Sequence, residues 1–444
     1  MNLVVIIFLL AYFLIILFRR YQLLVAYAAV IIIAALRLVP LQKLPGFINF
    51  NVLAIFITTS IITALLYEVG FIDYVATHTV NLIARRVKDE KKLRLIVMLT
   101  LVTLAGLISS FMENVATIML LYPVGLEVAR KLDIDPPSLL IGMSVVTNLE
   151  GSALLIGDSP SMITAMFMKM DFLDFFFLKA EHGKPSLFFA VQMGLVLGLL
   201  VLFFIFKGTV KRKRVKFDSE KFILEKRIES HIPLLIFGFY VLCLVASSFV
   251  PGKPDNYIVY LGGFFSLMSL LWTFLSFNRS REKKVDFLKH IDFQTFFFLI
   301  AIFILVGSLS YSGFIEKLAG WFTGTAKKFG KNPVLAGYVL IVFISMVVSA
   351  FVDNIPYTMA MLPVARDMAL SLGVSPYLFV FGLLLGTTIG GNITPIGSLS
   401  NVTIMGVLRK NHYKHDFWTF IKIGLPFTLA ALLVSSGFVY LVYR

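Results

Sequence analysis

The sequence has little charge and almost no cysteine for a chain of 444 residues. Charged residues make up 15% of it, whereas a soluble globular domain has about 25%. The single cysteine, Cys243, excludes a disulfide framework and a cysteine-rich metal site. Hydrophobic residues reach 59% and come as repeated runs long enough to cross a bilayer. Together with a mean hydropathy of +0.90, these runs indicate a polytopic integral membrane protein.

The formal net charge of +15 does not indicate a nucleic-acid-binding protein. The basic residues lie in short clusters between apolar runs, at 19–20, 85–94, 211–216 and 279–284. This distribution follows the positive-inside rule and differs from a basic groove for nucleic acid. We therefore expect a multi-pass protein of a plasma membrane, in contact with lipid and not with nucleic acid, with these clusters in the cytoplasm.

The lengths of the apolar runs predict an all-α fold with about ten transmembrane helices and two re-entrant hairpins. Two long runs, 138–168 and 376–408, carry glycines in their middles and are interpreted as broken helices. Two further runs, 94–130 and 332–370, are each split by an acid-Asn pair, which we place at a hairpin tip; the alternative is two ordinary spans in each case. The remaining runs each have the length of one span: 2–18, 22–39, 49–69, 186–207, 231–250, 256–277, 291–311 and 419–442.

The second half of the chain repeats the first at a constant offset of 240 residues. On the expected topology one repeat starts outside and the other inside, so the repeats are inverted, as in many secondary transporters. The predicted units are N-terminal helices at 1–48, a first repeat at 49–207, a basic linker with two helices at 208–290, and a second repeat at 291–442. The matched pairs are Asn114 and Asn354, Pro123 and Pro363, Leu132 and Leu372, Pro136 and Pro376, Gly142 and Gly382, Gly151 and Gly391, and Gly157 and Gly397.

Four carboxylates stand in apolar surroundings: Glu113, Glu150, Asp158 and Asp353. Each costs about 2.5–3.5 kcal/mol at the centre of a membrane helix, and together they cost roughly 10 kcal/mol. This penalty favours a polar cavity, an ion or a proton beside them. The structural alternative is a set of hydrogen-bonded or protonated side chains that hold helices together.

The two broken helices contain the segments "TNLEGSALLIGDSPS" (147–161) and "GTTIGGNITPIGSLSN" (386–401). Their glycines and prolines interrupt helical hydrogen bonding and leave carbonyl and amide groups unpaired. Freed carbonyls with Asn and Thr oxygens suit a hard cation such as sodium, whereas exposed helix N-termini suit an anion. Close helix packing is the structural alternative for the glycines alone.

These segments, with "ENVATIMLLYPV" (113–124) and "SAFVDNIPYTMAMLPV" (349–364), resemble the ion transporter superfamily with its citrate-transporter-like domain. The resemblance is nearest to the branch of arsenite permeases, NhaD-type sodium/proton antiporters and the P protein. It implies a central site between hairpin tips and broken helices, an elevator-like motion and a homodimer. It also implies sodium at Asn114, Gly151, Asn354 and Gly391. The site residues that it implies are Asn114, Thr117, Gly151, Asn354, Gly391, Asn392, Thr394 and Asn401, beside the four carboxylates.

Two departures from the family pattern concern the first broken helix. Glu150-Gly151 stands where relatives have Gly-Gly, and 159–161 reads Ser-Pro-Ser where they have Pro-Pro-Asn. The added carboxylate makes this half of the site more acidic, and the missing amide alters any sodium site built on relatives.

The predicted function is secondary active ion transport, with no enzyme activity and no cofactor beyond a coupling sodium ion or proton. A site with up to four carboxylates suits cations and protons and repels di- or tricarboxylates. We expect exchange of sodium or another small cation against protons, with Glu113 and Asp353 as the carriers. The alternative is an arsenite, oxyanion or organic anion permease, and a passive channel is a third possibility.

Overall fold

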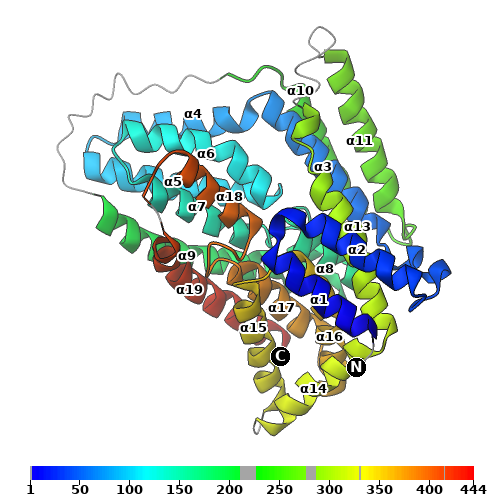
Figure 1. Cartoon of the computed structure of the whole chain (residues 1–444). Coiled ribbons are helices and arrows are strands. Elements are labelled where there is room, and N and C mark those ends of the chain that lie inside the picture. The colour runs from blue at the N-terminus through cyan, green and yellow to red at the C-terminus, as the bar shows by residue number, and fades with distance from the viewer. Residues whose placement is uncertain (1–2, 211–226, 277–286, 330–331, 415) are drawn as a thin grey trace.

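The computed structural model describes residues 3–210, 227–276, 287–329, 332–414 and 416–444. Regular structure in these ranges is almost entirely helical (Figure 1). The exception is one short antiparallel pair, β1 Phe177–Leu178 with β2 Lys184–Pro185. The helical structure confirms the all-α membrane fold. The helices of the first half are α1 Leu3–Leu17, α2 Gln22–Ala35, α3 Phe50–Glu68, α4 Phe71–Arg86, α5 Glu90–Ser109, α6 Asn114–Lys131, α7 Pro136–Glu150, α8 Ser159–Met168 and α9 Leu187–Thr209.

The second half follows the same order of elements. Its helices are α10 Ile232–Ser247, α11 Tyr257–Ser276, α13 Phe293–Tyr311, α14 Phe314–Lys328, α15 Pro333–Ser349, α16 Asn354–Leu372, α17 Pro376–Gly390, α18 Leu399–Lys410 and α19 Phe417–Tyr443. The internal repeat reappears in the helix starts. Helices α6 and α16, α7 and α17, and α8 and α18 each begin 240 residues apart.

Local sequence accounts for where these helices begin. Asp135 accepts a hydrogen bond from the backbone of Ser138, and Pro136 stands at the first helical position of α7. Asn332 caps α15 through the backbone of Leu335 and also precedes a proline. A side-chain acceptor followed by proline is the combination that a helix N-terminus favours.

Six helices in the described ranges are long and apolar enough to cross a membrane: α3, α5, α9, α11, the helix Phe287–Tyr311 that contains α13, and α19. Counting one bent pair as a span raises the number to seven. The number is below the expected ten because several apolar runs form shorter helices. It includes α5, which was expected to be a short arm of a re-entrant hairpin; we keep the word hairpin below for the pairs α5–α6 and α15–α16, without implying that they are re-entrant. Helix α10, for example, has 16 residues, and α7 and α17 have 15 each because both end at a break.

The N-terminal segment differs from the prediction of two full spans at 2–18 and 22–39. Helices α1 and α2 have 15 and 14 residues. Each is about 22 Å long at the helical rise, short of the about 30 Å of hydrocarbon. The chain bends by 120° between them, at the short 3-10 helix Arg19–Tyr21. The pair is therefore a bent element, either a broken span or a re-entrant loop, and its bend holds the basic residues that we expected in a cytoplasmic loop.

Helices α4 and α14 were not predicted as elements. Both follow a glycine with a left-handed backbone, Gly70 at φ 68° and Gly313 at φ 73°. Each buries one stripe of apolar residues and exposes the opposite face, which carries charge. Their mixed composition is too polar for the apolar-run criterion, which is why it missed them.

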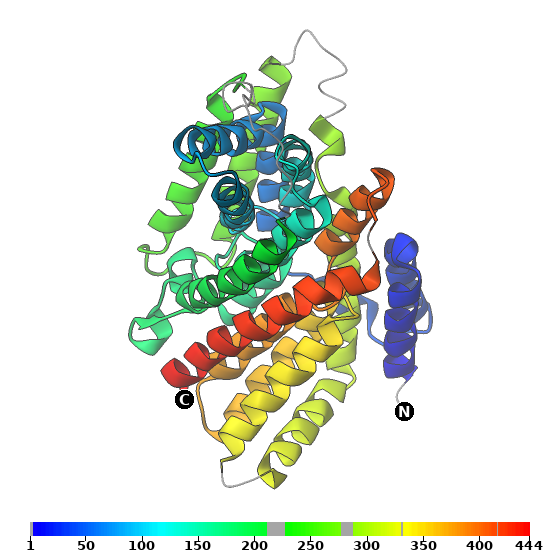
Figure 2. The same cartoon turned by 90° about the vertical axis from the view of Figure 1, so that its left-hand side faces the viewer.

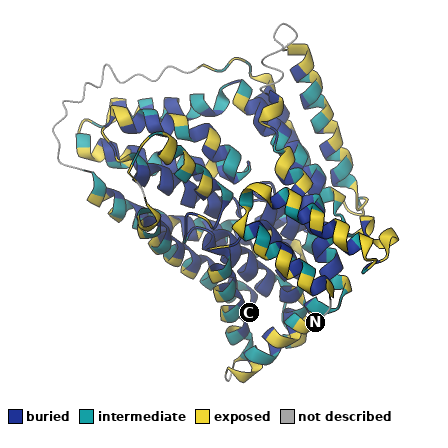
Figure 3. Ribbon diagram, in the orientation of Figure 1, coloured by how far each residue is buried: buried dark blue, intermediate teal, exposed yellow. Residues whose placement is uncertain are grey.

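The helices form two groups: one contains α2, α3, α11 and α13, and the other contains the hairpins and broken helices together with α9 and α19. Helix α11 packs against α3 and α2 against α13, on the right-hand side of Figure 1. The long helices α9 and α19 pack against each other, and α17 packs against α19 (Figure 2). Buried residues fill the space where the helices meet, while the outer faces are exposed (Figure 3). Many exposed residues on the outer faces are large and apolar, as a lipid environment requires; Val196, Phe204, Tyr260, Leu275, Leu433 and Leu441 are examples.

Candidate functional site

Among the described helices, four begin around one cavity of about 30 Å³. They are α6 and α16, which follow the two hairpin breaks, and α8 and α18, which follow the two broken-helix segments. The chain thus brings both repeats to one point, as expected for a central site. The lining residues are Glu113, Asn114, Val115, Asp158, Ser159, Pro160, Asp353, Asn354, Ile355, Ser398 and Leu399.

Three carboxylates of this cavity cap the helices that they precede. Glu113 Oε2 accepts the backbone N–H of Val115 at 2.7 Å. Asp158 Oδ1 accepts the backbone N–H of Ser161 at 2.9 Å. Asp353 Oδ1 accepts the backbone N–H of Ile355 at 3.1 Å. Backbone N–H donors and the positive end of a helix both stabilise a nearby carboxylate. The caps explain how acids are tolerated at this depth.

Several oxygens of the site remain without a partner. Asp158 Oδ2, Ser159 Oγ and Thr117 Oγ1 are buried and have no hydrogen-bond partner. Buried polar atoms are normally paired, so an unpaired group indicates a missing ligand, water or ion. Carboxylate and hydroxyl oxygens are suitable ligands for a hard cation. The unpaired oxygens of Asp158 and Ser159, which both line the cavity, are therefore candidate donors to a transported or coupling sodium ion.

A network of amide side chains joins the two repeats directly behind the cavity. Asn148 lies at its centre and is completely buried. Its Nδ2 donates to Asn392 Oδ1 at 2.7 Å and to Asn401 Oδ1 at 3.1 Å. Its Oδ1 accepts from Asn114 Nδ2 at 3.3 Å and from Ser400 Oγ at 2.7 Å. We did not predict Asn148, although an amide in the apolar helix directly before the first break was visible in the sequence.

The hairpin tips have the same internal geometry in both repeats. Ser109 Oγ donates to Asn114 Oδ1 at 2.6 Å, and Ser349 Oγ donates to Asn354 Oδ1 at 2.6 Å. Each bond links the last turn of one hairpin arm to the first residue of the next arm. The bonds fix the orientation of both asparagines, which line the cavity.

The hairpin-tip geometry shared by the two repeats explains why Gly151 and Gly391 stand at the start of the two breaks. A Cβ at Gly151 would lie 2.4 Å from Asn114 Oδ1, and a Cβ at Gly391 would lie 3.0 Å from Asn354 Oδ1. The contact at Gly151 is not possible unless the asparagine moves, and the contact at Gly391 requires a small shift of a few tenths of an ångström. Both glycines are therefore required for close approach between hairpin and broken helix.

The missing amide of the first repeat is replaced by a hydroxyl. Ser161 Oγ donates to the Gly151 carbonyl at 3.2 Å, and Asn401 Nδ2, 240 residues later, donates to the Gly391 carbonyl at 2.9 Å. Asn401 also donates to the Thr394 carbonyl at 3.1 Å. Both carbonyls predicted to bind sodium thus already accept one bond from the protein.

The other predicted site residues lie at different distances from the cavity. Thr394 donates from its hydroxyl to the Ala350 carbonyl, and Asn392 donates to the Val145 carbonyl at 2.9 Å. Both support the break and do not line the cavity.

Glu150 lies apart from this centre. It is completely buried, and both its oxygens accept from Gln192 Nε2 on α9, at 3.1 and 2.9 Å. The carboxylate does not line the cavity of the other three acids. Its environment matches the structural alternative, a hydrogen-bonded pair that joins two helices.

The two hairpin acids face spaces of very different size. Glu113 also lines a cavity of about 670 Å³ between α3, α6 and α13. Asp353 lines a cavity of about 10 Å³ that is covered by the bend between α1 and α2. The described conformation is therefore open toward one acid and closed over the other. The larger cavity has polar and aromatic walls, which include Phe56, Thr59, Ser60, Tyr67, His290 and Asp292.

Within the described residues, no group of three or more His, Cys, Asp or Glu side chains could hold a metal ion.

A family model described as citrate transporter matches residues 12–386. An uncharacterized transporter of Mycobacterium tuberculosis is 29% identical over 398 residues, covering 89% of this chain and 87% of the relative. The P protein of Sus scrofa is 26% identical over 465 residues, covering 89% of this chain and 53% of that protein.

Two solved transporters share the fold. The YdaH transporter of Alcanivorax borkumensis superposes with a TM-score of 0.57 at 14% identity, covering 91% of this chain and 89% of that one. MtrF of Neisseria gonorrhoeae, described as illuminating a class of antimetabolite efflux pumps, gives a TM-score of 0.57 at 14% identity, covering 93% and 84%. At this identity the likeness concerns the fold alone.

Proposed function

The chain belongs to the citrate transporter family and is a secondary transporter of the cell membrane, and we propose that it exchanges sodium or another small cation for protons. The observation that carries this proposal is the cavity formed by four helix N-termini and three capping carboxylates. We also propose that the protein acts as a homodimer.

The charge of this cavity favours a cation. Each helix N-terminus contributes about +0.5 elementary charge, so four contribute about +2 against −3 from three ionised carboxylates. The sum is about −1, which one monovalent cation or one proton neutralises. A tricarboxylate would instead bring the sum to about −4, without a compensating charge.

Glu113 and Asp353 are the proposed carriers. Asp158 would join them only when the ion binds, because no group of three acids in the described residues could hold a metal ion as they now stand. Glu113 is reached from the large cavity, while Asp353 lies under the bend of α1 and α2. Cation and proton would occupy the same carboxylates in turn. Coupling then follows from competition, because a site that holds one of them cannot hold the other.

The two helix groups provide a basis for alternating access. The hairpins and broken helices pack on one another across the repeats, and α3 and α13 contact them through α8 and α16. We propose that the bundle of hairpins and broken helices moves as a unit, in an elevator-like manner, against α3, α11 and α13.

The direct test is a pH-gradient assay with the purified protein in proteoliposomes. Sodium, lithium, potassium, citrate and arsenite are added in turn, and internal pH is followed with a trapped dye. Cation-evoked proton movement that saturates supports the proposal. Accumulation of citrate or arsenite without any response to the cations contradicts it.

An organic anion or oxyanion is the second candidate. It is favoured by the family match and by the 670 Å³ cavity, which is larger than a bare ion needs. The helix N-termini would bind such an anion once the carboxylates are protonated. The same assay, repeated at lower pH, separates the two candidates. Anion transport would increase at low pH, because the carboxylates are then protonated.

A further inference from the structure

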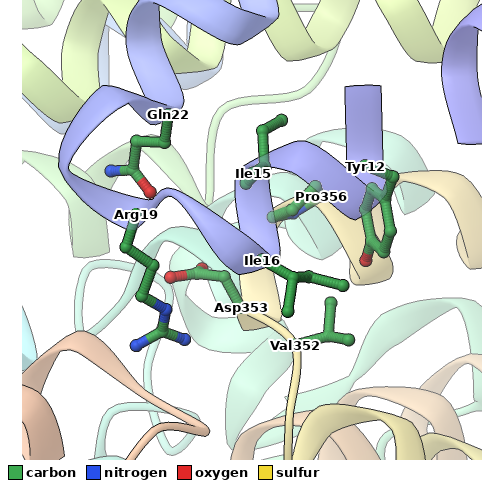
Figure 4. Close-up of a pocket in the computed structure, with 8 residues that line it drawn as sticks. All are labelled: Tyr12, Ile15, Ile16, Arg19, Gln22, Val352, Asp353 and Pro356. Atoms are coloured by element: carbon green, nitrogen blue, oxygen red, sulfur yellow. The ribbon is translucent and has the colours of Figure 1, made fainter. Parts of the chain in front are cut away.

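The bend between α1 and α2 places a basic side chain beside one of the proposed carriers. Arg19, at the start of the bend, and Asp353, at the tip of the second hairpin, line the same small cavity (Figure 4). The cavity measures about 10 Å³, close to the 10–15 Å³ that one water molecule requires. The other lining residues are Tyr12, Ile15, Ile16, Gln22, Val352 and Pro356.

Two of the three nitrogens of the Arg19 guanidinium have no partner. Its Nη1 and Nη2 atoms are buried and make no hydrogen bond, and the hydroxyl of Tyr12 in the same cavity is also buried and unpaired. Arg20, the next residue, is exposed. A buried charge without a partner is strongly unfavourable, and inside a membrane it marks a functional position. Arg19 as a whole is half-buried, but its two terminal nitrogens are buried, so a partner in another state of the protein would stabilise them.

Asp353 is the acid that shares this cavity. One of its oxygens caps α16 through the backbone of Ile355. The carboxylate is not hydrogen-bonded to Arg19, because both terminal nitrogens of that guanidinium are unpaired. A change of rotamer in a long side chain, across a space of about one water molecule, would close the ion pair.

The two groups belong to different parts of the fold. Arg19 is held by α1 and α2, which pack against α13. Asp353 directly precedes α16, in the bundle that we propose to move. Any displacement of the hairpin against α13 changes the distance between them. Arginine stays charged at every physiological pH, so its interaction with Asp353 needs no proton.

We propose that Arg19 is a tethered cation that binds Asp353 when the site is empty and competes with the transported cation for that carboxylate. This inference rests on the proposed cation exchange. It assigns Arg19 as a residue that sets the cation affinity of the site, and α1–α2 as the element that carries it. Neither is part of the two repeats that bind the ion.

The experiment measures cation-evoked proton movement for wild type, Arg19→Gln, Arg19→Lys and Arg20→Gln in proteoliposomes. Arg19→Gln lowers the half-saturating cation concentration about tenfold if the ion pair occupies the site nine-tenths of the time. Arg19→Lys keeps a positive charge, so its half-saturating cation concentration lies between those of wild type and Arg19→Gln. Arg20→Gln, at an exposed position, has the wild-type value. An unchanged or raised half-saturating concentration in Arg19→Gln overturns the inference.

A second readout does not depend on transport. The unfolding temperature of the detergent-solubilised protein is titrated with the same cation, since binding stabilises the folded state in proportion to occupancy. In Arg19→Gln the stabilisation sets in at a lower cation concentration than in wild type. A wild type that shows this stabilisation but no proton movement contradicts the proposed exchange and leaves the role of Arg19 supported. Loss of anion transport in Arg19→Gln, with the cation response unchanged, would assign Arg19 to an anionic substrate and overturn the inference.

Discussion

Asp158 and Ser398 stand 240 residues apart, precede equivalent helices and line the same cavity, yet only one of them is an acid. Asp158 caps α8 through Ser161, whereas Ser398 donates from its hydroxyl to Asn148 at 3.0 Å. The two repeats are thus equivalent in backbone and different in charge. This difference gives the cavity its odd number of carboxylates.

The first prediction concerns moving the carboxylate of Asp158 from the first repeat to the second. Asp158→Asn brings the charge of the cavity from about −1 to about 0, so the half-saturating cation concentration rises about tenfold or more. Adding Ser398→Asp to this variant restores the charge and recovers part of the affinity. The half-saturating concentrations of both variants are measured from proton flux as a function of cation concentration. Equal affinities in wild type and Asp158→Asn would show that Asp158 does not contact the ion.

Glu150 gives the second prediction. Glu150→Gln keeps a hydrogen-bonding partner for Gln192 and therefore keeps transport close to the wild-type rate. Glu150→Ala leaves the half-buried amide of Gln192 unpaired and lowers the free energy of unfolding by about 1 kcal/mol. Transport rates and unfolding temperatures of the two variants check this. A loss of coupling in Glu150→Gln would return this acid to the transport mechanism.

The third prediction concerns the close approach of the two glycines. Gly151→Ala places a Cβ 2.4 Å from an asparagine oxygen, and Gly391→Ala places one 3.0 Å away. Both variants lose about 1–3 kcal/mol of unfolding free energy, and Gly151→Ala loses more because its contact is shorter. Gly238→Ala, where no atom lies within 4 Å of the new Cβ, is the matched control and keeps the wild-type unfolding temperature.

Asn148 carries the fourth prediction. Asn148→Ala removes bonds to both repeats and leaves several buried polar groups unpaired, each at a cost of about 1–3 kcal/mol. The unfolding temperature falls and transport is lost together. Gln42→Ala, at an exposed position in the 3-10 helix Leu41–Lys43, leaves both unchanged and serves as the control. If Asn148→Ala kept wild-type stability, the amide network would not hold the repeats together.

The repeat made much of this site predictable. Residues 240 apart in the sequence marked the helix starts, the glycines and the two hairpin acids, and helices α6–α8 and α16–α18 begin where that offset requires. The glycines and prolines in 147–161 and 386–401 also predicted where the two broken helices are interrupted. These features are local, so the sequence carries them directly.

Features that depend on direction or on contact between distant segments were not predictable. An acid in an apolar run indicates burial, but not whether it points at the cavity, as Asp158 does, or at α9, as Glu150 does. Apolar length alone could not distinguish the short, bent pair of α1 and α2 from two spans. For the same reason Arg19, read as part of a cytoplasmic cluster, was not placed beside Asp353.

The most direct test of cation-proton exchange compares wild type with Glu113→Gln and Asp353→Asn in proteoliposomes under an imposed cation gradient. Internal pH is recorded while the gradient is reversed. In wild type the direction of proton movement reverses with the gradient, and in both variants it stops, although the proteins remain monodisperse. Wild-type proton movement with unchanged pH dependence in Asp353→Asn would contradict the account.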